Sequence, residues 1–167
     1  MEMESLCHPF PAIYAPDSRI LILGSFPSVK SREQMFFYGH PQNRFWRVMA
    51  ALLSADVPQT VAEKRAFLLA NHIALWDVIA SCDIAGSSDA SIRNAVPNDL
   101  TLILETACIR QIFTNGGTAH RLYRKYIYPL TGREDAVLPS TSPANAARSL
   151  DALINAWQPV REALKEE

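Results

Sequence analysis

Cysteine is scarce in this sequence, and long apolar runs are absent from it. Cys7, Cys82 and Cys108 lie far apart, without the close pairs from which zinc and iron–sulfur sites are usually built. The first residues carry glutamates instead of the positive region of a signal peptide, and no stretch has the length of a transmembrane helix. We therefore expect no metal and no membrane anchor, and a reducing cytoplasm as the location.

An excess of charge of either sign is also missing. The formal net charge is −1, which argues against a strongly basic nucleic-acid-binding module but allows an enzyme that contacts a few phosphates through a local patch. The 167 residues suffice to bury about 70% of the surface of the unfolded chain. We expect residues 1–167 to form a single domain.

Three familiar catalytic motifs are absent as well. The sequence contains no Gly-x-Gly-x-x-Gly after its first apolar run, no Gly-Lys-Ser/Thr phosphate loop and no Gly-x-Ser-x-Gly elbow. Nucleotide cofactors and esterase chemistry are therefore not expected, and no other cofactor is implied.

Short apolar runs alternate with segments of helical spacing. Buried strands are predicted at residues 19–24, 73–78, 109–114 and 136–138. Helices are predicted at residues 44–55, 60–71, 97–108 and 118–128, with a last helix from Pro143 past Trp157 that Pro159 breaks. The remaining segments are an extended lead-in at 1–18, a long loop at 25–39 with a helical turn near 32–36, and a loop at 81–91.

This alternation predicts the α/β class, with a parallel sheet covered by helices on both faces. In such sheets ligands bind beyond the carboxyl ends of the strands. The predicted strand ends carry Gly24 to Ser28, Asp77, Asn115 to Gly117 and Ser140 to Ser142. We expect these segments to converge on one pocket, together with the stretch Tyr38 to Asn43.

Asn43 precedes the first predicted helix, and two interpretations of it are open. Asparagine is favoured at a helix N-cap, because its side chain accepts a hydrogen bond from a free backbone N–H. Asn43 also stands in a stretch of nine residues, Tyr38 to Trp46, that gathers aromatic, imidazole, amide and guanidinium groups. Such a combination is equally typical of a binding site.

Four motifs follow the predicted strand ends in order. They are Gly24-Ser25-Phe26-Pro27-Ser28, Tyr38-Gly39-His40-Pro41-Gln42-Asn43-Arg44-Phe45-Trp46, Leu75-Trp76-Asp77-Val78 and Leu138-Pro139-Ser140-Thr141-Ser142-Pro143-Ala144-Asn145. In this order they resemble the uracil-DNA glycosylase superfamily, and more narrowly its hypoxanthine-DNA glycosylase (DNA-deoxyinosine glycosylase) branch. The resemblance covers residues 19–150, and the ordered set is far more specific than any single motif.

The resemblance implies a three-layer α/β/α domain around a four-stranded parallel sheet. It also implies a monofunctional, monomeric enzyme of base excision repair, without cofactor, acting in the cytoplasm at the nucleoid. Such an enzyme flips a deaminated base out of double-stranded DNA and hydrolyses its N-glycosidic bond, leaving an abasic site. Hypoxanthine is the expected base and uracil a possible second one. The alternatives are a uracil or thymine mismatch-specific glycosylase and a non-catalytic module that binds damaged DNA.

Site roles follow from the matching positions. Asn43 matches the catalytic amide, which orients water or binds the leaving base, and Tyr38 matches the aromatic ring on which the base stacks. The other matching residues fall into two groups by expected contact. Expected at the base are Gly24, Ser25, Phe26 and Asp77, and expected at the DNA are Ser28, His40 and the minor-groove loop residues Ser140, Thr141 and Ser142.

The chain departs from the family pattern at two places. Phe26 stands where the uracil-specific and thymine-mismatch branches carry an activating Asp or Asn, so Asn43 must carry more of the catalysis. Ser142 and Pro143 stand where relatives often carry a leucine wedge.

Three alternatives without a functional role remain open beside these assignments. Asp77 can serve as a helix cap, and His40 as a structural turn residue instead of a catalytic acid or base. The third concerns a set of cations that form either a phosphate-contacting face or an ordinary solvated surface. These are Lys30, Arg32, Arg44, Arg47, Arg121, Arg124 and Lys125.

Overall fold

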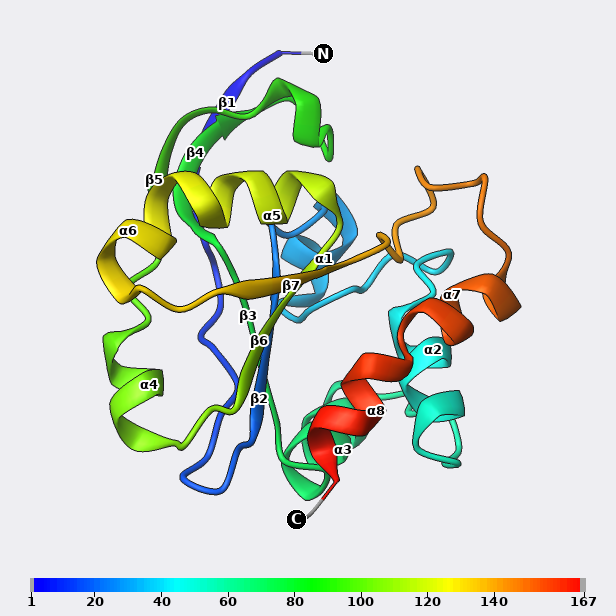
Figure 1. The fold of residues 1–167 in the computed structure, drawn as a ribbon. Helices are drawn as coiled ribbons and strands as arrows, with labels where there is room; N and C mark the ends of the chain where they lie inside the picture. Colours follow the sequence, from blue (N-terminus) through cyan, green and yellow to red (C-terminus); the bar gives the residue numbers. More distant parts are fainter. Residues whose placement is uncertain (1, 166–167) are drawn as a thin grey trace.

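A four-stranded parallel sheet forms the centre of the computed structural model, which describes residues 2–165 (Figure 1). Its strand order is β3-β2-β6-β7. These strands are β2 (Ile20–Gly24), β3 (Ile73–Asp77), β6 (Gln111–Asn115) and β7 (Asp135–Leu138). The four predicted strands and their parallel pairing are confirmed.

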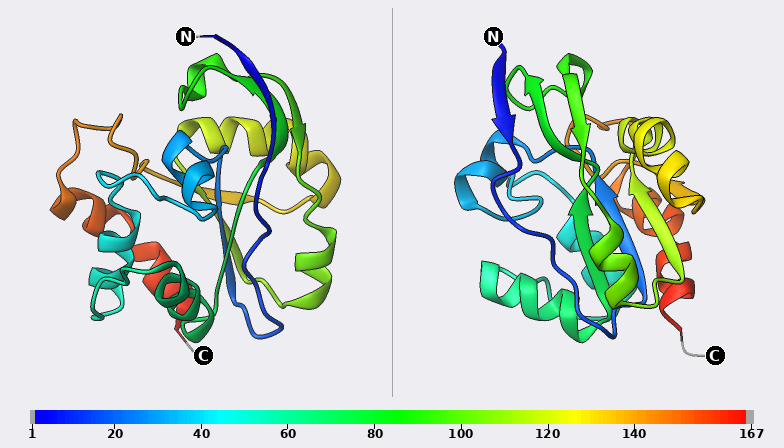
Figure 2. Two further views of the ribbon diagram at one scale, coloured as in Figure 1. Left: turned by 180° about the vertical axis from the view of Figure 1, so that it is seen from behind. Right: turned by 90° about the vertical axis from the view of Figure 1, so that its left-hand side faces the viewer.

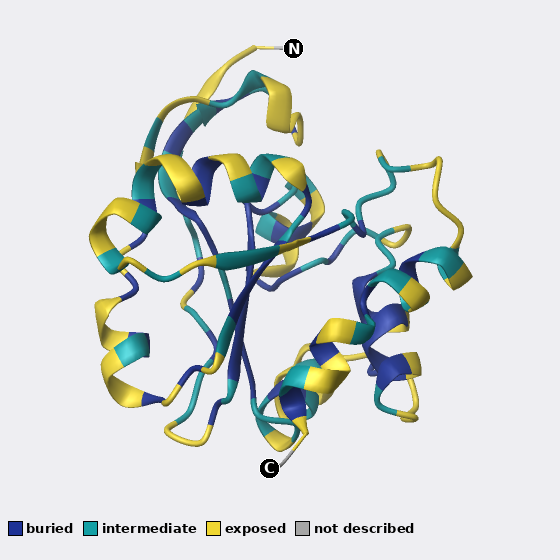
Figure 3. Cartoon of the chain, in the orientation of Figure 1, coloured by how far each residue is buried: buried dark blue, intermediate teal, exposed yellow. Residues whose placement is uncertain are grey.

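Helices cover both faces of this sheet, because its strands are apolar on both sides. Ile20 and Ile22 pack into one core, and Leu21 and Leu23 pack into the other. The first core is shared with α2 (Phe45–Leu52), α3 (Val61–Ala70), α7 (Leu150–Ala156) and α8 (Gln158–Leu164). The second is shared with α4 (Thr101–Thr106), α5 (Gly117–Leu122) and the π-helix η2 (Tyr123–Ile127). The predicted three-layer α/β/α architecture is confirmed, and β2, at its centre, is buried along its whole length (Figure 3).

Several helix boundaries differ from the prediction. The long loop contains α1 (Val29–Gln34), which begins and ends earlier than the expected turn. Pro129 does not end its helix, because it lies in the first turn of α6 (Tyr128–Thr131), where proline needs no N–H partner. The last helix begins at Leu150 and not near Pro143, and its expected break before Pro159 is confirmed.

A second sheet was missed by the sequence analysis. It is antiparallel with the order β1-β4-β5, formed by β1 (Glu4–Cys7), β4 (Ile79–Ile84) and β5 (Arg93–Pro97) (Figure 2). The prediction of a loop at 81–91 was therefore wrong for residues 81–84, and a 3₁₀-helix η1 (Asp89–Ser91) ends that segment. Register shifts between β4 and β5 interrupt the two-residue period, which hides the strand pattern. The lead-in is extended as predicted, but it includes β1.

The helices between residues 2 and 165 include none with the length and apolar character that a membrane span requires.

Asp135 at the start of β7 supports a prediction about stability. Its fully buried side chain accepts a hydrogen bond from the Thr114 hydroxyl at 2.7 Å and pairs with Nδ1 of His120 at 2.6 Å. Loss of the imidazole leaves a buried carboxylate with one remaining partner. We expect His120→Ala to lower the free energy of unfolding by about 1–3 kcal/mol, measured by urea denaturation. Arg121→Ala, an exposed change on the same helix, should stay within about 0.5 kcal/mol of the parent; equal effects of the two changes would contradict the prediction.

Candidate active site

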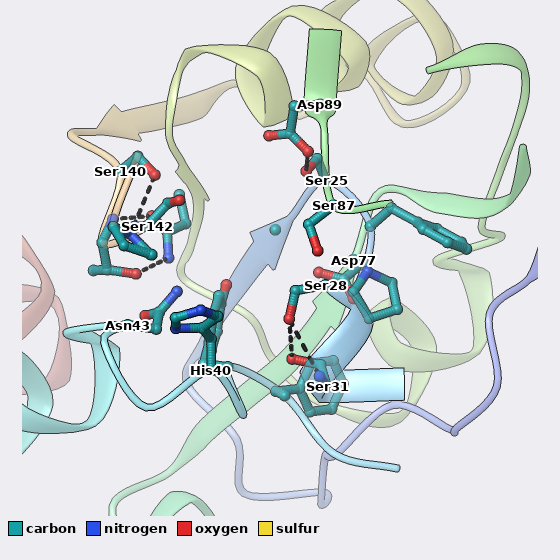
Figure 4. Close-up of a pocket in the computed structure, with 18 residues that line it drawn as sticks. Ser25, Ser28, Ser31, His40, Asn43, Asp77, Ser87, Asp89, Ser140 and Ser142 are labelled. Carbon is teal, nitrogen blue, oxygen red and sulfur yellow. Dashed lines mark hydrogen bonds between the residues drawn. The ribbon is translucent and has the colours of Figure 1, made fainter. Parts of the chain in front are cut away.

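One pocket lies beyond the carboxyl ends of the four parallel strands, as the topology predicts. It is walled by the end of β2 at Gly24, the end of β3 at Asp77, the end of β6 at Asn115 and the segment after β7 (Figure 4). The structure brings together in it every site residue predicted from the sequence. These are Gly24, Ser25, Phe26, Ser28, Tyr38, His40, Asn43, Asp77, Ser140, Thr141 and Ser142.

Asn43 has both of the roles that the sequence left open, because it caps a helix and also lines the pocket. Its Oδ1 accepts a hydrogen bond from the backbone N–H of Phe45 at 2.9 Å, which caps the first turn of α2. The formal N-cap is Arg44, one residue later than expected. The cap occupies the amide oxygen only. Nδ2 has no hydrogen-bond partner within residues 2–165, so Asn43 lines the pocket with a free donor.

Asp77 is held at the deep end of the pocket. It is 4% exposed, and its Oδ2 lies 2.7 Å from Nε2 of His8, a residue outside the four motifs. Its Oδ1 faces Gly24, where a Cβ atom would sit only 2.4 Å from that oxygen. Asp77 ends a strand and bonds an imidazole, so the helix-cap alternative for it was wrong.

Tyr38 is placed between Asp77 and α2. One face of its ring stacks on Phe45 with a centroid distance of 4.2 Å, so only the other face is available to a ligand. Its hydroxyl is buried, and a Cβ on Gly24 would lie 3.0 Å from it. Burial of the hydroxyl, followed by the negative charge of Asp77, raises the pKa of Tyr38 above its ordinary value. Tyr38 is therefore a neutral group at physiological pH.

Phe26 gives the pocket wall no water-activating group, but a carboxylate lies nearby. Asp89 of η1 also lines the pocket, and its Oδ1 accepts a hydrogen bond from the Ser25 hydroxyl at 2.8 Å. Enclosure of the carboxylate raises the pKa of Asp89; the charge of Asp77 acts in the same direction and the Ser25 bond opposes it. Asp89 was not among the predicted site residues, because it follows the strand that the sequence analysis missed.

Asn115 lines the pocket, as expected for the end of its strand, although no role was predicted for it. Its amide makes two hydrogen bonds of 3.0 Å with Thr141, accepting from the backbone N–H and donating to the hydroxyl. The end of β6 is thereby tied to the segment after β7. Its position at a strand end was the available signal.

His40 has a structural contact in the turn before Asn43. Its Nδ1 accepts a hydrogen bond from the backbone N–H of Gln42 at 3.0 Å, while the ring also lines the pocket. The structural alternative for His40 is therefore present, and it leaves Nε2 available for a ligand.

Arg44 and Arg32 brace loops instead of contributing to a phosphate-contacting face. The guanidinium of Arg44 donates to the carbonyl oxygens of Ser142 at 3.2 Å, Asn145 at 2.9 Å and Arg148. That of Arg32 donates to the carbonyls of Pro27 at 2.9 Å and Gly86 at 3.1 Å. Neither alternative left open by the sequence, a phosphate-contacting face or an ordinary solvated surface, describes these two side chains, because their guanidinium groups are hydrogen-bonded to carbonyl oxygens. The other five cations of the set are exposed.

These bonds support a prediction about the loop at residues 142–148. We expect Arg44→Ala to raise KM for the substrate of this pocket about tenfold, because a loop that must be ordered on binding lowers affinity. Limited proteolysis should cut the loop faster in this variant. Arg47→Ala removes the same charge from an exposed position on α2, so a matching rise in KM there would assign the effect to charge and contradict the brace.

The sequence over residues 11–165 matches the family model of the uracil DNA glycosylase superfamily. The chain belongs to this superfamily. The resemblance inferred from the four motifs is thereby confirmed.

Relatives within the superfamily match most of the chain. A protein named hypoxanthine DNA glycosylase from Methanosarcina acetivorans is 36% identical over 138 residues, which are 81% of this chain and 86% of the relative. A protein of the same name from Methanosarcina barkeri is 30% identical over 149 residues, 89% of this chain and 93% of the relative. The solution NMR structure of a candidate uracil DNA glycosylase from Methanosarcina acetivorans has a TM-score of 0.80 at 33% identity, covering 94% of this chain and 97% of that one.

Proposed function

We propose that this chain is a DNA glycosylase that removes hypoxanthine from deoxyinosine in double-stranded DNA. Superfamily membership and the two relatives named hypoxanthine DNA glycosylase support this substrate. The observation that carries the proposal is the meeting of Asn43, Tyr38 and Asp77 in one pocket where Phe26 replaces an activating Asp or Asn. The enzyme acts as a monomer of one domain, in the cytoplasm and at the nucleoid.

The flipped base enters the pocket and is read at its edge. Tyr38 offers its free ring face for stacking, because Phe45 covers the other one. The carboxylate of Asp77 accepts a hydrogen bond from N1–H of hypoxanthine, and Gly24 leaves room for that contact. N3–H of uracil offers the same donor, which makes uracil a second substrate candidate.

Cleavage of the glycosidic bond builds positive charge on the sugar and negative charge on the leaving base. Stabilising these charges matters more than a strong nucleophile. The free Nδ2 donor of Asn43 serves this step by hydrogen bonding to the leaving base or by orienting the attacking water. Among the described residues no lysine lines the pocket, so an amine nucleophile is not at hand and the enzyme hydrolyses the bond without a lyase step.

The segment Ser140 to Ser142 approaches the duplex from the minor-groove side. It is held by Asn115 on one side and by Arg44 on the other, because Arg44 also donates its backbone N–H to the carbonyl of Thr141 at 3.1 Å. A fixed segment at the pocket mouth can support DNA from which a base has been withdrawn. Ser28 and His40 line the same pocket and contact the flipped nucleotide and its phosphates.

The proposal is tested by incubating the protein with duplexes that contain inosine, uracil or a G·T mismatch and then cleaving abasic sites with alkali. We expect product from inosine, with uracil as the weaker substrate. Preferred cleavage of the uracil or G·T duplex would instead assign the protein as a uracil or thymine mismatch-specific glycosylase. Inosine-specific binding without any product would select the non-catalytic binding module and reject the proposed enzyme.

A further inference from the structure

The side chain of His8 is enclosed in a way that leaves it one polar contact among the described residues. Its side chain is 4% exposed. The rings of Phe10, Phe26, Phe37 and Trp76 surround it with centroid distances of 4.6, 6.0, 6.1 and 6.5 Å. Nε2 lies 2.7 Å from Oδ2 of Asp77, whereas Nδ1 is buried without a partner. An imidazole enclosed in this way cannot turn to another partner.

The second sheet fixes the backbone of His8 beside Asp77. His8 follows β1 directly, and its backbone N–H donates to the carbonyl of Ala80 at 2.7 Å. The preceding residue, Cys7, pairs with Ser81 of β4. Farther along the lead-in, Ile13 forms a bridge with Leu75 of β3. Contacts on both sides of His8 therefore anchor the lead-in to the strand that carries Asp77 and to the strand that follows it.

A proton on Nε2 of His8 fits the enclosure of the ring. It donates to Oδ2 of Asp77 and leaves a lone pair, not an orphaned N–H, at the buried Nδ1. Asp77 then receives a hydrogen bond at Oδ2 and presents only lone pairs at Oδ1, on the side that Gly24 leaves uncovered.

We propose that His8 is a positioning residue that keeps Asp77 an obligate hydrogen-bond acceptor and thereby limits the pocket to bases with a ring N–H at the edge that is read. The inference rests on the proposed function. Hypoxanthine N1–H and uracil N3–H donate to Oδ1. Adenine N1 and cytosine N3 present lone pairs to the same oxygen and are repelled. The pair thus separates deaminated bases from their amino parents.

A hydrogen-bond acceptor can distinguish hypoxanthine from adenine, which exclusion by size cannot do. Adenine has nearly the shape of hypoxanthine, so a pocket that only measured shape would accept both. A buried group that must accept a hydrogen bond rejects the analogue without the donor, by as much as about 10⁴-fold where the group is fully desolvated. Guanine shares the N1–H of hypoxanthine, so the His8–Asp77 pair does not discriminate against it.

Two substitutions at His8 separate the hydrogen bond that the imidazole donates from the volume that its ring fills. His8→Phe occupies the aromatic enclosure without donating, whereas His8→Gln keeps an N–H for Asp77. We expect His8→Phe to lower the single-turnover rate on inosine duplexes by about 10- to 100-fold, the usual cost of losing a partner that orients a ligand-contacting group. His8→Gln should stay within a few-fold of the parent by the same reasoning. The ratio of inosine to adenine excision should fall in His8→Phe and stay near the parent value in His8→Gln.

Asp77→Asn provides the second arm of the test and does not depend on the folding of His8→Phe. An amide can donate to N1 of adenine, so this variant should bind free adenine and free hypoxanthine with similar affinity in a thermal-shift titration, whereas the parent favours hypoxanthine. Unchanged base ratios in Asp77→Asn, or equal losses in the two His8 variants, would overturn the inference and leave the glycosylase intact. A parent protein that excises no deaminated base would overturn the proposed function instead.

Discussion

Asn43→Ala should lower the single-turnover rate of hypoxanthine excision by about 10²- to 10³-fold, the usual effect of removing one aligned hydrogen-bond donor from a site where charge develops. The reason is local to the pocket. Phe26 contributes no activating group, and the Asn43 Nδ2 donor is not used by another protein group among residues 2–165. The rate should be measured with enzyme in excess over inosine duplex, so that product release does not mask the chemical step.

The same substitution also removes a helix cap, and the two effects must be separated. Loss of the Asn43 Oδ1 bond to the Phe45 N–H should cost about 1 kcal/mol of stability. Asn43→Ser restores an accepting oxygen at the cap but lacks the amide, so it should regain stability and remain slow. Gln42→Ala removes a neighbouring exposed amide and should leave the rate unchanged. A normal rate in Asn43→Ala would remove Asn43 from the chemistry.

The central sheet was predictable because its signals are local. The runs at 19–24, 73–78, 109–114 and 136–138 are apolar and short, and parallel topology then requires their carboxyl ends to meet. Gly24, Asp77 and Asn43 were therefore predictable members of one pocket, and all three line it. Proline predicted helix boundaries less well. Pro129 lies inside the first turn of α6 and does not end a helix, and no helix begins near Pro143.

The second sheet and its consequences were not predictable in the same way. Pairing of β1 with β4 joins Leu6 to Cys82, more than 70 positions later, and the buried residues of β4 do not keep a strict two-residue alternation. The contacts of His8 with Asp77 and of Asp89 with Ser25 depend on that sheet and its following turn. Composition also could not show that Arg32 and Arg44 direct their guanidinium groups to carbonyl oxygens.

Gly24→Ala should lower kcat/KM for inosine duplexes by about 10²-fold, the scale expected when a reading group shifts by about 1 Å. The added Cβ would sit 2.4 Å from Oδ1 of Asp77 and 3.0 Å from the Tyr38 hydroxyl. Neither side chain can yield easily, because His8 holds the other oxygen of Asp77 and Phe45 supports the ring of Tyr38. The contact that reads the base must therefore move.

Backbone strain cannot account for such a loss, because the φ angle of Gly24 is not among the positive ones. Gly117→Ala is the matched control. Its Cβ would meet no atom within 4 Å at the start of α5, so activity should stay at the parent level. The melting temperature of each variant shows whether the loss reflects folding, since overpacking costs about 1–3 kcal/mol. A Gly24→Ala enzyme that is folded and fully active would mean that Oδ1 of Asp77 does not read the base, because the methyl group occupies the space through which that contact is made.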